Sequence, residues 1–287
     1  MIDRKQTASY FSHGTLTRKE HYRYMNILSA AILGIVEGIS EFLPISSTAH
    51  LILTSQLMRL EQSNFLKSFE IAIQLGAILA VVALYGKRLA MNFKTLKLVI
   101  AAFIPTAVIG FIFYKMIKNV FFNNNHIILW SLLLGGIFLI IFELLHREKK
   151  EALNEIPSMS YPQAFMIGIF QSIAVIPGVS RAAATIIGGL ILGLKRKTIV
   201  EFSFLLAVPT MGAAVALDLI KSADTFKPGD FLSLSVGFLV SFVVALLSIK
   251  CLLGFIKKHN FIPFGIYRII LALVFLFIKT TGVSPRN

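Results

Sequence analysis

Residues 34–50 read GIVEGISEFLPISSTAH, and this polar stretch lies inside an otherwise apolar part of the chain. It places glutamates, a proline, a run of hydroxyls and a histidine where a membrane-spanning helix would be expected. A proline inside a helix removes a backbone hydrogen bond and clashes with the preceding turn. The stretch therefore predicts a helix that is broken near Pro44, with polar side chains gathered at the break.

The composition is that of a membrane protein. Of the 287 residues, 56% are hydrophobic and 15% are charged, whereas soluble domains carry about 25% charged residues. Several apolar runs approach the roughly 20 residues that a helix needs to cross a bilayer. We expect an all-α polytopic membrane protein.

The net charge of +14 does not indicate nucleic acid. The basic residues fall mostly in short segments between apolar runs, where they set topology and meet anionic headgroups. Little chain is left to carry a nucleic-acid surface. Residues 1–24 are polar and lack the apolar core of a secretory signal. We expect residues 1–24 to be a disordered extension and residues 25–287 to form one integral membrane domain.

Six runs are predicted to span the membrane. Basic clusters lie in the connections, and they share one side only if the segment 162–194 enters and leaves the bilayer on the same face. This predicts a re-entrant hairpin broken at IPGVSR, and the same logic predicts a second hairpin over 27–58 broken at LPISS. The six runs are 71–85, 98–118, 127–145, 200–220, 231–253 and 262–279.

The two broken segments resemble each other. Residues 34–50 align with 168–185 with one gap, and three predicted spans lie between them, so the second copy is inverted. The repeat halves are about 25–126 and 127–287. Broken helices at matching places in inverted halves indicate a site near the bilayer midplane. The aligned pairs are Gly34 with Gly168, Glu37 with Gln171, Pro44 with Pro177, Ser47 with Ser180 and, further on, Glu70 with Glu201.

Glu37 and Glu41 are spaced to share a helix face. Carboxylates within the membrane must face protein or water. Side by side they suit a hard cation such as Mg²⁺ or Ca²⁺. The alternative is that both are satisfied by hydrogen bonds to neighbouring backbone.

Hydroxyls follow the break at Ser46, Ser47 and Thr48. They could cap a new helix, or flank a helix N-terminus that binds an anion. His50 lies just beyond them. It is either a packing residue or an acid, base or nucleophile.

The second break supplies Gly178, Ser180, Arg181 and Thr185. An arginine in an apolar segment needs an anionic partner, either a phosphate or one of the two glutamates. Thr185 shares the face of Arg181. Together with the first break, these residues fit phosphoryl chemistry on a substrate with a lipid tail and a phosphate head.

The motifs EGISEFLPISSTAH, FEIAIQLGAILAVV, PGVSR, EFSFLLAVP and FIPFGIYR resemble those of the undecaprenyl-diphosphate phosphatases, also called bacitracin resistance proteins. The resemblance implies a bacterial plasma-membrane enzyme that hydrolyses undecaprenyl diphosphate to undecaprenyl phosphate and inorganic phosphate. This reaction recycles the lipid carrier of peptidoglycan synthesis. The resemblance also implies dependence on Mg²⁺ or Ca²⁺ and a site open to the outer face.

The resemblance assigns roles to the residues of both breaks. Where the family usually reads SRSGAT, this chain has Ala182 and Ala183, which casts doubt on an essential role for a hydroxyl at position 182. The nucleophile is left open between water, Ser47 and His50, and one glutamate could be the base. The rival hypothesis is a polyprenyl-phosphate flippase or an ion-coupled transporter, which would show the same repeats and broken helices. The expected catalytic residues are Glu37, Glu41, Ser47, His50 and Arg181, the substrate-binding residues are Ser46, Thr48, Gly178, Ser180, Arg181 and Thr185, and the metal ligands are Glu37 and Glu41.

Overall fold

The computed structural model describes residues 24–116, 125–148, 151–222, 226 and 228–280. Within these ranges the regular elements are helices, which confirms the all-α prediction. Apart from Tyr24, the polar segment 1–24 lies outside the described residues. The α-helices are α1 (Ile27–Ser40), α2 (Ser47–Leu57), α3 (Asn64–Ala72), α4 (Gln74–Met91), α5 (Phe93–Met116), α6 (Asn125–Leu145), α7 (Tyr161–Ser172), α8 (Arg181–Ile191), α9 (Arg196–Lys221), α10 (Phe231–Phe255) and α11 (Ile262–Thr280).

Five helical segments of the described residues are long and apolar enough to cross a membrane. They contain four of the six predicted spans and overlap a fifth, 98–118, whose last two residues lie outside the described residues. The sixth is α11, whose apolar part, Ile262–Ile278, is shorter. Large apolar side chains point outward, and Phe111, Leu145 and Ile220 are each at least 78% exposed. Such surfaces suit lipid rather than water, so the chain is a multi-pass membrane protein. The five segments are Asn64–Lys87, Phe93–Phe113, His126–Leu145, Arg196–Lys221 and Pro228–Phe255.

Both predicted breaks are present, and each divides a hairpin of two short helices. The first hairpin consists of α1 and α2, and residues 41–46 connect them. The second consists of α7 and α8, joined through a 3-10 turn, η3 (Ile173–Val175), and the loop that contains Gly178. In each hairpin the two helices pack against one another.

The packing of the helices supports the internal repeat. Helix α1 packs on α10, and its counterpart α7 packs on α5; likewise α4 contacts α10, and α9 contacts α5. The aligned glycines take the same role. A Cβ on Gly34 would meet the carbonyl of Gly237 in α10, and a Cβ on Gly168 would meet that of Ala102 in α5. The hairpin of each repeat thus packs on a helix of the other repeat, as expected for two copies related by a twofold axis.

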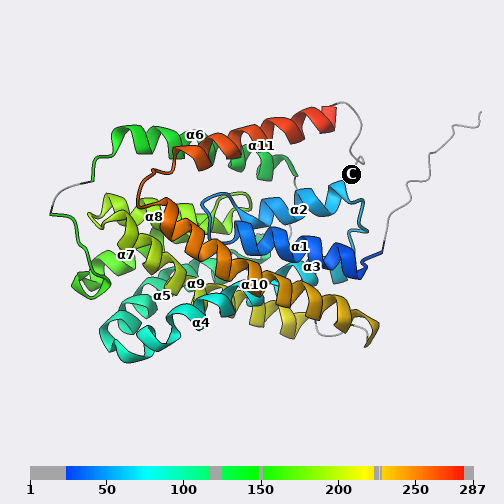
Figure 1. The fold of residues 1–287 in the computed structure, drawn as a ribbon, viewed down its shortest axis with the longest axis horizontal. Helices are drawn as coiled ribbons and strands as arrows, with labels where there is room; N and C mark the ends of the chain where they lie inside the picture. Colours follow the sequence, from blue (N-terminus) through cyan, green and yellow to red (C-terminus); the bar gives the residue numbers. More distant parts are fainter. Residues whose placement is uncertain (1–23, 117–124, 149–150, 223–225, 227, 281–287) are drawn as a thin grey trace, which may run out of the picture.

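The two hairpins lie on opposite sides of the molecule and meet near its middle (Figure 1). Helices α6 and α11 run side by side along the top of this view, in contact with each other. Helix α10 crosses in front of α1. The breaks therefore lie within the bundle, which is where the sequence predicted the site.

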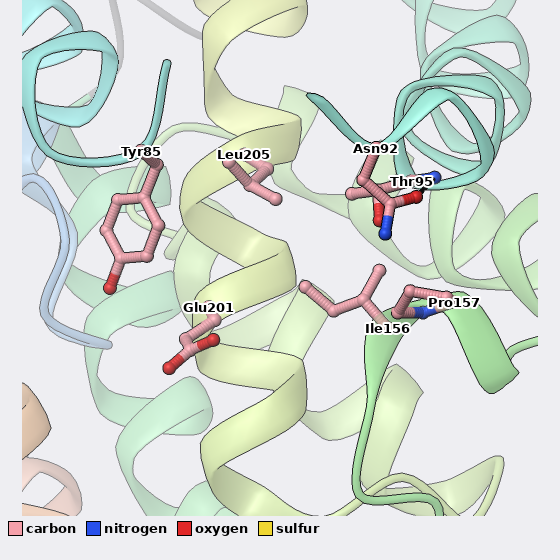
Figure 2. Close-up of a pocket in the computed structure, with 7 residues that line it drawn as sticks. All are labelled: Tyr85, Asn92, Thr95, Ile156, Pro157, Glu201 and Leu205. Carbon is pink, nitrogen blue, oxygen red and sulfur yellow. Dashed lines mark hydrogen bonds between the residues drawn. The ribbon is translucent and has the colours of Figure 1, made fainter. Parts of the chain in front are cut away.

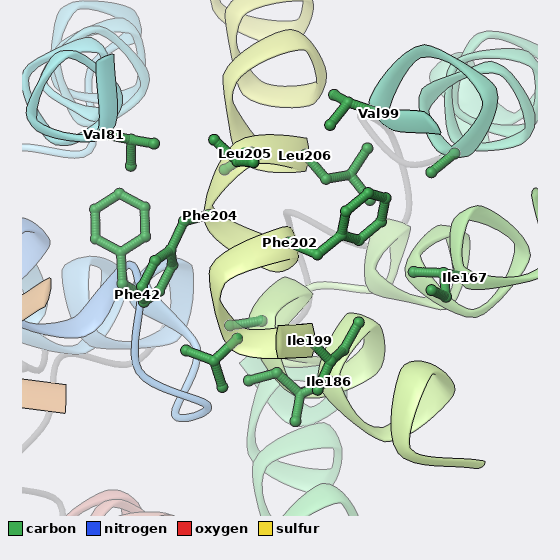
Figure 3. Packing of buried hydrophobic residues seen from close by; sticks show 14 of the residues in the cluster. Phe42, Val81, Val99, Ile167, Ile186, Ile199, Phe202, Phe204, Leu205 and Leu206 are labelled. Carbon is green, nitrogen blue, oxygen red and sulfur yellow. The ribbon is translucent and has the colours of Figure 1, made fainter. Parts of the chain in front are cut away.

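Aromatic packing fixes the first break against α9. Phe42, in the break itself, is fully buried and meets Phe204 edge-on, with ring centroids 5.3 Å apart. In Figure 3 the Phe42 ring lies between Val81 and the ring of Phe204, which extends from α9. Burial of such a ring contributes about 1.5–3 kcal/mol, so this contact holds the polar residues on either side of Phe42 in place.

Candidate active site

At the first break α1 ends at Ser40, with Glu41 as its C-cap, and α2 begins at Ser47, directly after Ser46. Ser46 has a φ of 74° and makes no side-chain capping bond to α2. A non-glycine residue in this left-handed region is strained by about 1–3 kcal/mol. The first backbone N–H groups of a helix have no partner within the helix. In α2 the capping side chain that would accept from them is absent.

The second break is built differently. Gly178 takes a φ of 91°, which suits glycine, and a Cβ there would lie 2.6 Å from the Ile128 carbonyl in α6. The backbone at Gly178 therefore lies in close contact with α6. Ser180 caps α8 by accepting from the Ala183 N–H at 3.2 Å. The sequence predicted capping only for the hydroxyls of the first break, yet Ser180 of the second break is the one that caps.

An ion pair joins the two breaks. Arg181, the first residue of α8, donates from Nη2 to Glu41 Oε1 at 3.0 Å across 140 residues of sequence. Its Nη1 donates to the Ser203 carbonyl at 2.9 Å. The Ser47 hydroxyl donates to the other Glu41 oxygen at 2.5 Å. Glu41 thus holds a cation on one oxygen and a hydroxyl on the other.

Glu37 lies one turn before Glu41 and is fully buried. Neither of its oxygens accepts a hydrogen bond from any residue that the structure describes. The charged groups that act on it are Glu41, Glu70 and Arg181. An unpaired buried carboxylate is costly, and the backbone alternative is therefore wrong for this glutamate.

Glu37 and Glu41 fit a hard cation. Their oxygens are the donors that Mg²⁺ and Ca²⁺ prefer, and Mg²⁺ in particular is often held by only one or two carboxylates plus water and substrate phosphates. Among the described residues there is no group of three or more acidic, histidine or cysteine side chains placed to hold a metal. The orphaned Glu37 oxygens are the observation that favours such an ion here.

His50 lies in the first turn of α2 and contacts α11. Its Nδ1 lies 2.7 Å from the Ser46 carbonyl, which can only accept, so Nδ1 carries the proton. Nε2 is then the acceptor for the Tyr267 hydroxyl at 2.8 Å, and the two rings are stacked. His50 is therefore attached to the first break through Ser46, while its basic nitrogen faces α11.

Thr185 belongs to a separate polar network behind Arg181. Its hydroxyl contacts Gln171 Oε1 at 3.2 Å and the Arg181 carbonyl at 2.9 Å. Gln171 Nε2 donates to the hydroxyls of Thr106 and Thr210, both at 3.0 Å. This network supports the first turn of α8 from α5, α7 and α9. Thr48 is half-buried in the first turn of α2.

Sequence reasoning gave no role to two residues of α11, Tyr267 and Arg268, although both lie in the motif FIPFGIYR. Arg268 is 1% exposed and donates to backbone carbonyls of both breaks. The rule that flagged Arg181, that a charge within an apolar run is functional or paired, applies equally to Arg268. Ser203 gave no signal, because it lies in an unbroken helical run.

A small pocket lies apart from this cluster. Figure 2 shows that it is lined by Tyr85, Glu201 and Leu205 on one side and by Asn92, Thr95, Ile156 and Pro157 on the other. The cavity volume is only about 30 Å³. None of its lining residues belongs to either break. Glu201 lines this pocket, whereas its aligned partner Glu70 acts electrostatically on Glu37, so the two glutamates lie in different surroundings.

Comparison with known proteins identifies the family. The family model described as bacitracin resistance protein BacA matches residues 30–274. The chain belongs to this family. A protein named undecaprenyl-diphosphatase from Aquifex aeolicus is 54% identical over 246 residues, covering 86% of this chain and 96% of that protein.

Other BacA relatives agree over nearly their whole length. The undecaprenyl-diphosphatase of Sulfurihydrogenibium sp. is 53% identical over 251 residues, covering 88% of this chain and 98% of that protein. That of Wolinella succinogenes is 50% identical over 253 residues, with the same coverage of each. The residues matched by the family model include both breaks and α11 up to residue 274.

Proposed function

We propose that this protein is an undecaprenyl-diphosphate phosphatase of the bacterial plasma membrane, with its site open to the outer face. It hydrolyses undecaprenyl diphosphate to undecaprenyl phosphate and inorganic phosphate. The ion pair between Glu41 and Arg181 carries the proposal, because it places a phosphate-binding cation beside a carboxylate and a hydroxyl inside a membrane bundle. Membership of the BacA family and the names of the relatives support it.

The terminal phosphate would bind between the two breaks. Arg181 would exchange Glu41 for phosphate oxygens, which its planar guanidinium suits in a bidentate manner. Ser203 keeps the other nitrogen of the guanidinium in place during this exchange. The uncapped N-terminus of α2, which includes Ser47 and Thr48, adds N–H donors for an anion.

Glu37 and Glu41 would hold a divalent cation, Mg²⁺ or Ca²⁺. When bound, it neutralises charge on the phosphate oxygens and so favours the transition state. The two carboxylates otherwise repel each other, and neutralisation also lets an anionic diphosphate approach them. Glu70 lies close enough to act electrostatically on Glu37 and adds to the negative charge that needs a counter-ion.

The geometry favours Ser47 as nucleophile. Its hydroxyl already donates to Glu41 Oε2, which is the arrangement of a nucleophile and its base. Ser47 Oγ would form a bond to the terminal phosphorus as the bridging P–O bond breaks, and the serine proton passes to Glu41. Undecaprenyl phosphate leaves. Water then attacks the phosphoserine and gives up one proton to His50 Nε2, while Glu41 returns its proton to the departing Ser47 Oγ and inorganic phosphate leaves.

The outward orientation follows from charge. Four basic clusters follow the first and third predicted spans and precede the fourth and the last, as Lys94 with Lys97 and Lys195 with Lys197 do, and the positive-inside rule would put all four on the cytoplasmic side. The first hairpin then enters from the outer face. Modification of cysteines placed in these connections by a membrane-impermeant reagent tests this orientation.

The test of function is phosphate release from undecaprenyl diphosphate by purified protein in detergent, with Mg²⁺ and with EDTA. We expect release in Mg²⁺, little in EDTA, and a loss of at least about 100-fold in Glu41→Gln. Glu201→Gln is the matched control, because Glu201 lies in the separate pocket. If the folded wild-type protein transported lipid without releasing phosphate, the phosphatase assignment would be wrong and a flippase would be favoured.

A further inference from the structure

Arg268 is the largest fully buried side chain in the part of the chain that the structure describes. It lies in the apolar helix α11, where an unpaired charge is costly. No acidic side chain of the described residues forms an ion pair with it. Its partners are main-chain carbonyls, so its position must be explained by the backbone that it contacts.

Its donors reach four carbonyls on three separate segments. Nη1 contacts the Pro44 carbonyl at 3.3 Å, and Nη2 contacts the Gly178 carbonyl at 3.0 Å. The remaining contacts are to α6, from Nη2 to Ser131 at 2.9 Å and from Nε to Leu132 at 3.3 Å. One guanidinium thus bonds to the first break, the second break and the neighbouring helix.

Both contacted residues lie next to the site. Pro44 lies two positions before Ser46, and Gly178 lies two positions before Ser180. Arg268 therefore fixes the backbone immediately before each half-helix that supplies the site. None of these four hydrogen bonds reaches Glu41 or Arg181, so Arg268 would act on that pair only through the backbone.

The helix α6 leaves room for this guanidinium. At Gly135 an added Cβ would collide with Arg268 Nη2 and would come to 3.0 Å from Cζ. The displaced group would be the end of the arginine side chain. Gly135→Ala therefore offers a way to disturb Arg268 without changing its charge and without touching either break.

We propose that Arg268 is a positioning residue that sets the first break in register with the second, so that Glu41 and Arg181 meet. The inference rests on the proposed function for its activity readout. Misplacement of reacting groups by about 1 Å costs on the order of 100-fold in rate. A single side chain bonded to both breaks controls such a displacement directly.

Activity tests this through coupling with Arg181. We expect Arg268→Lys to lower kcat/KM by at least about 10-fold, because an ammonium cannot reach four carbonyls in this geometry, and Gly135→Ala to cause a loss of similar size. Gly254→Ala is the control, since a Cβ there meets nothing within 4 Å. In an Arg181→Lys background, Arg268→Lys should cost less than about threefold more. Equal losses in both backgrounds would overturn the proposal.

A distance measurement separates this proposal from the function. Spin labels at Leu57→Cys and Ile191→Cys, both more than half exposed, report the separation of α2 and α8 once Cys251 is replaced by serine. We expect Arg268→Lys and Gly135→Ala to shift or broaden the distance distribution, and Gly254→Ala to leave it unchanged. An unchanged distribution in both test variants overturns the positioning role, whereas the absence of phosphate release from wild type overturns only the proposed function.

Discussion

The two breaks occupy equivalent places in the repeat but differ in how well their polar groups are satisfied. At the second break Gln171 bonds to three threonine hydroxyls, and Ser180 caps its helix. At the first break Glu37 has no hydrogen-bond partner among the described residues, and α2 lacks a cap. Apart from Arg181 Nε, which has no partner among the described residues, the second break is therefore the better satisfied, and the first holds the unpaired carboxylate and uncapped helix that a cation and a substrate would complete.

The largest effect is expected at the residue that joins the breaks. Arg181→Ala should lower kcat/KM for phosphate release by about 1,000-fold, and Arg181→Lys by about 100-fold, because an ammonium cannot replace a bidentate fork. Ala182→Ser, which restores a hydroxyl usual in the family, should stay within about twofold. Steady-state phosphate release measures all three. If Arg181→Ala retained a tenth of the wild-type activity, the proposed role of Arg181 in joining the two breaks would be contradicted.

The comparison also predicts opposite effects on stability. Gln171→Glu places a charge where three hydroxyls now satisfy an amide, and we expect it to lower the free energy of unfolding by about 1–3 kcal/mol. Glu37→Gln removes an unpaired buried charge and should leave stability unchanged or raise it. Thermal melts in detergent without added metal measure both. Destabilisation by Glu37→Gln would mean that Glu37 has a structural partner after all.

A smaller effect is expected at the histidine. Tyr267→Phe removes the hydroxyl that contacts His50 Nε2 but keeps the stacked ring. We expect a loss of about 3–10-fold in kcat with little change in melting temperature, because one orienting hydrogen bond contributes about 0.5–1.5 kcal/mol. Tyr161→Phe, at the exposed start of α7, is the control. Equal kcat values for the two variants would contradict a role of the Tyr267 hydroxyl in the active site.

The smallest effect separates the two helix starts. Ser180→Ala removes a cap and should cost about 1 kcal/mol, which corresponds to a fall of about 2–4 °C in melting temperature for a protein of this size. Ser46→Ala removes no capping bond and should change the melting temperature by less. Differential scanning fluorimetry compares the two. If Ser46→Ala were the more destabilising substitution, the proposed difference in capping between α2 and α8 would be wrong.

Much of this arrangement could be predicted from the sequence. Prolines and polar runs located both breaks, and the cost of charge in lipid predicted a partner for Arg181, either a phosphate or one of the two glutamates; Glu41 is the glutamate that it meets. The internal alignment predicted an inverted repeat, and the packing of α1 on α10 and of α7 on α5 agrees with it. These features depend on local chemistry that a single sequence carries.

The rest depended on contacts between distant segments. Gln171 draws its partners from α5, α8 and α9, and no spacing in the sequence relates Thr106 to Thr210. Arg268 reaches carbonyls, which every residue has, so no side chain in the sequence indicates its partners. The sixth predicted span was nearly correct in its limits, although its apolar part is shorter than a full span.

The most direct test of the difference between the breaks is phosphate release by Glu37→Gln and Gln171→Glu, measured together in saturating Mg²⁺ and normalised to folded protein. We predict a loss of at least about 100-fold in Glu37→Gln. Gln171→Glu should stay within about threefold of wild type. A Glu37→Gln protein that keeps its activity, or a folded Gln171→Glu protein that loses it, would contradict the assignment of the chemistry to the first break.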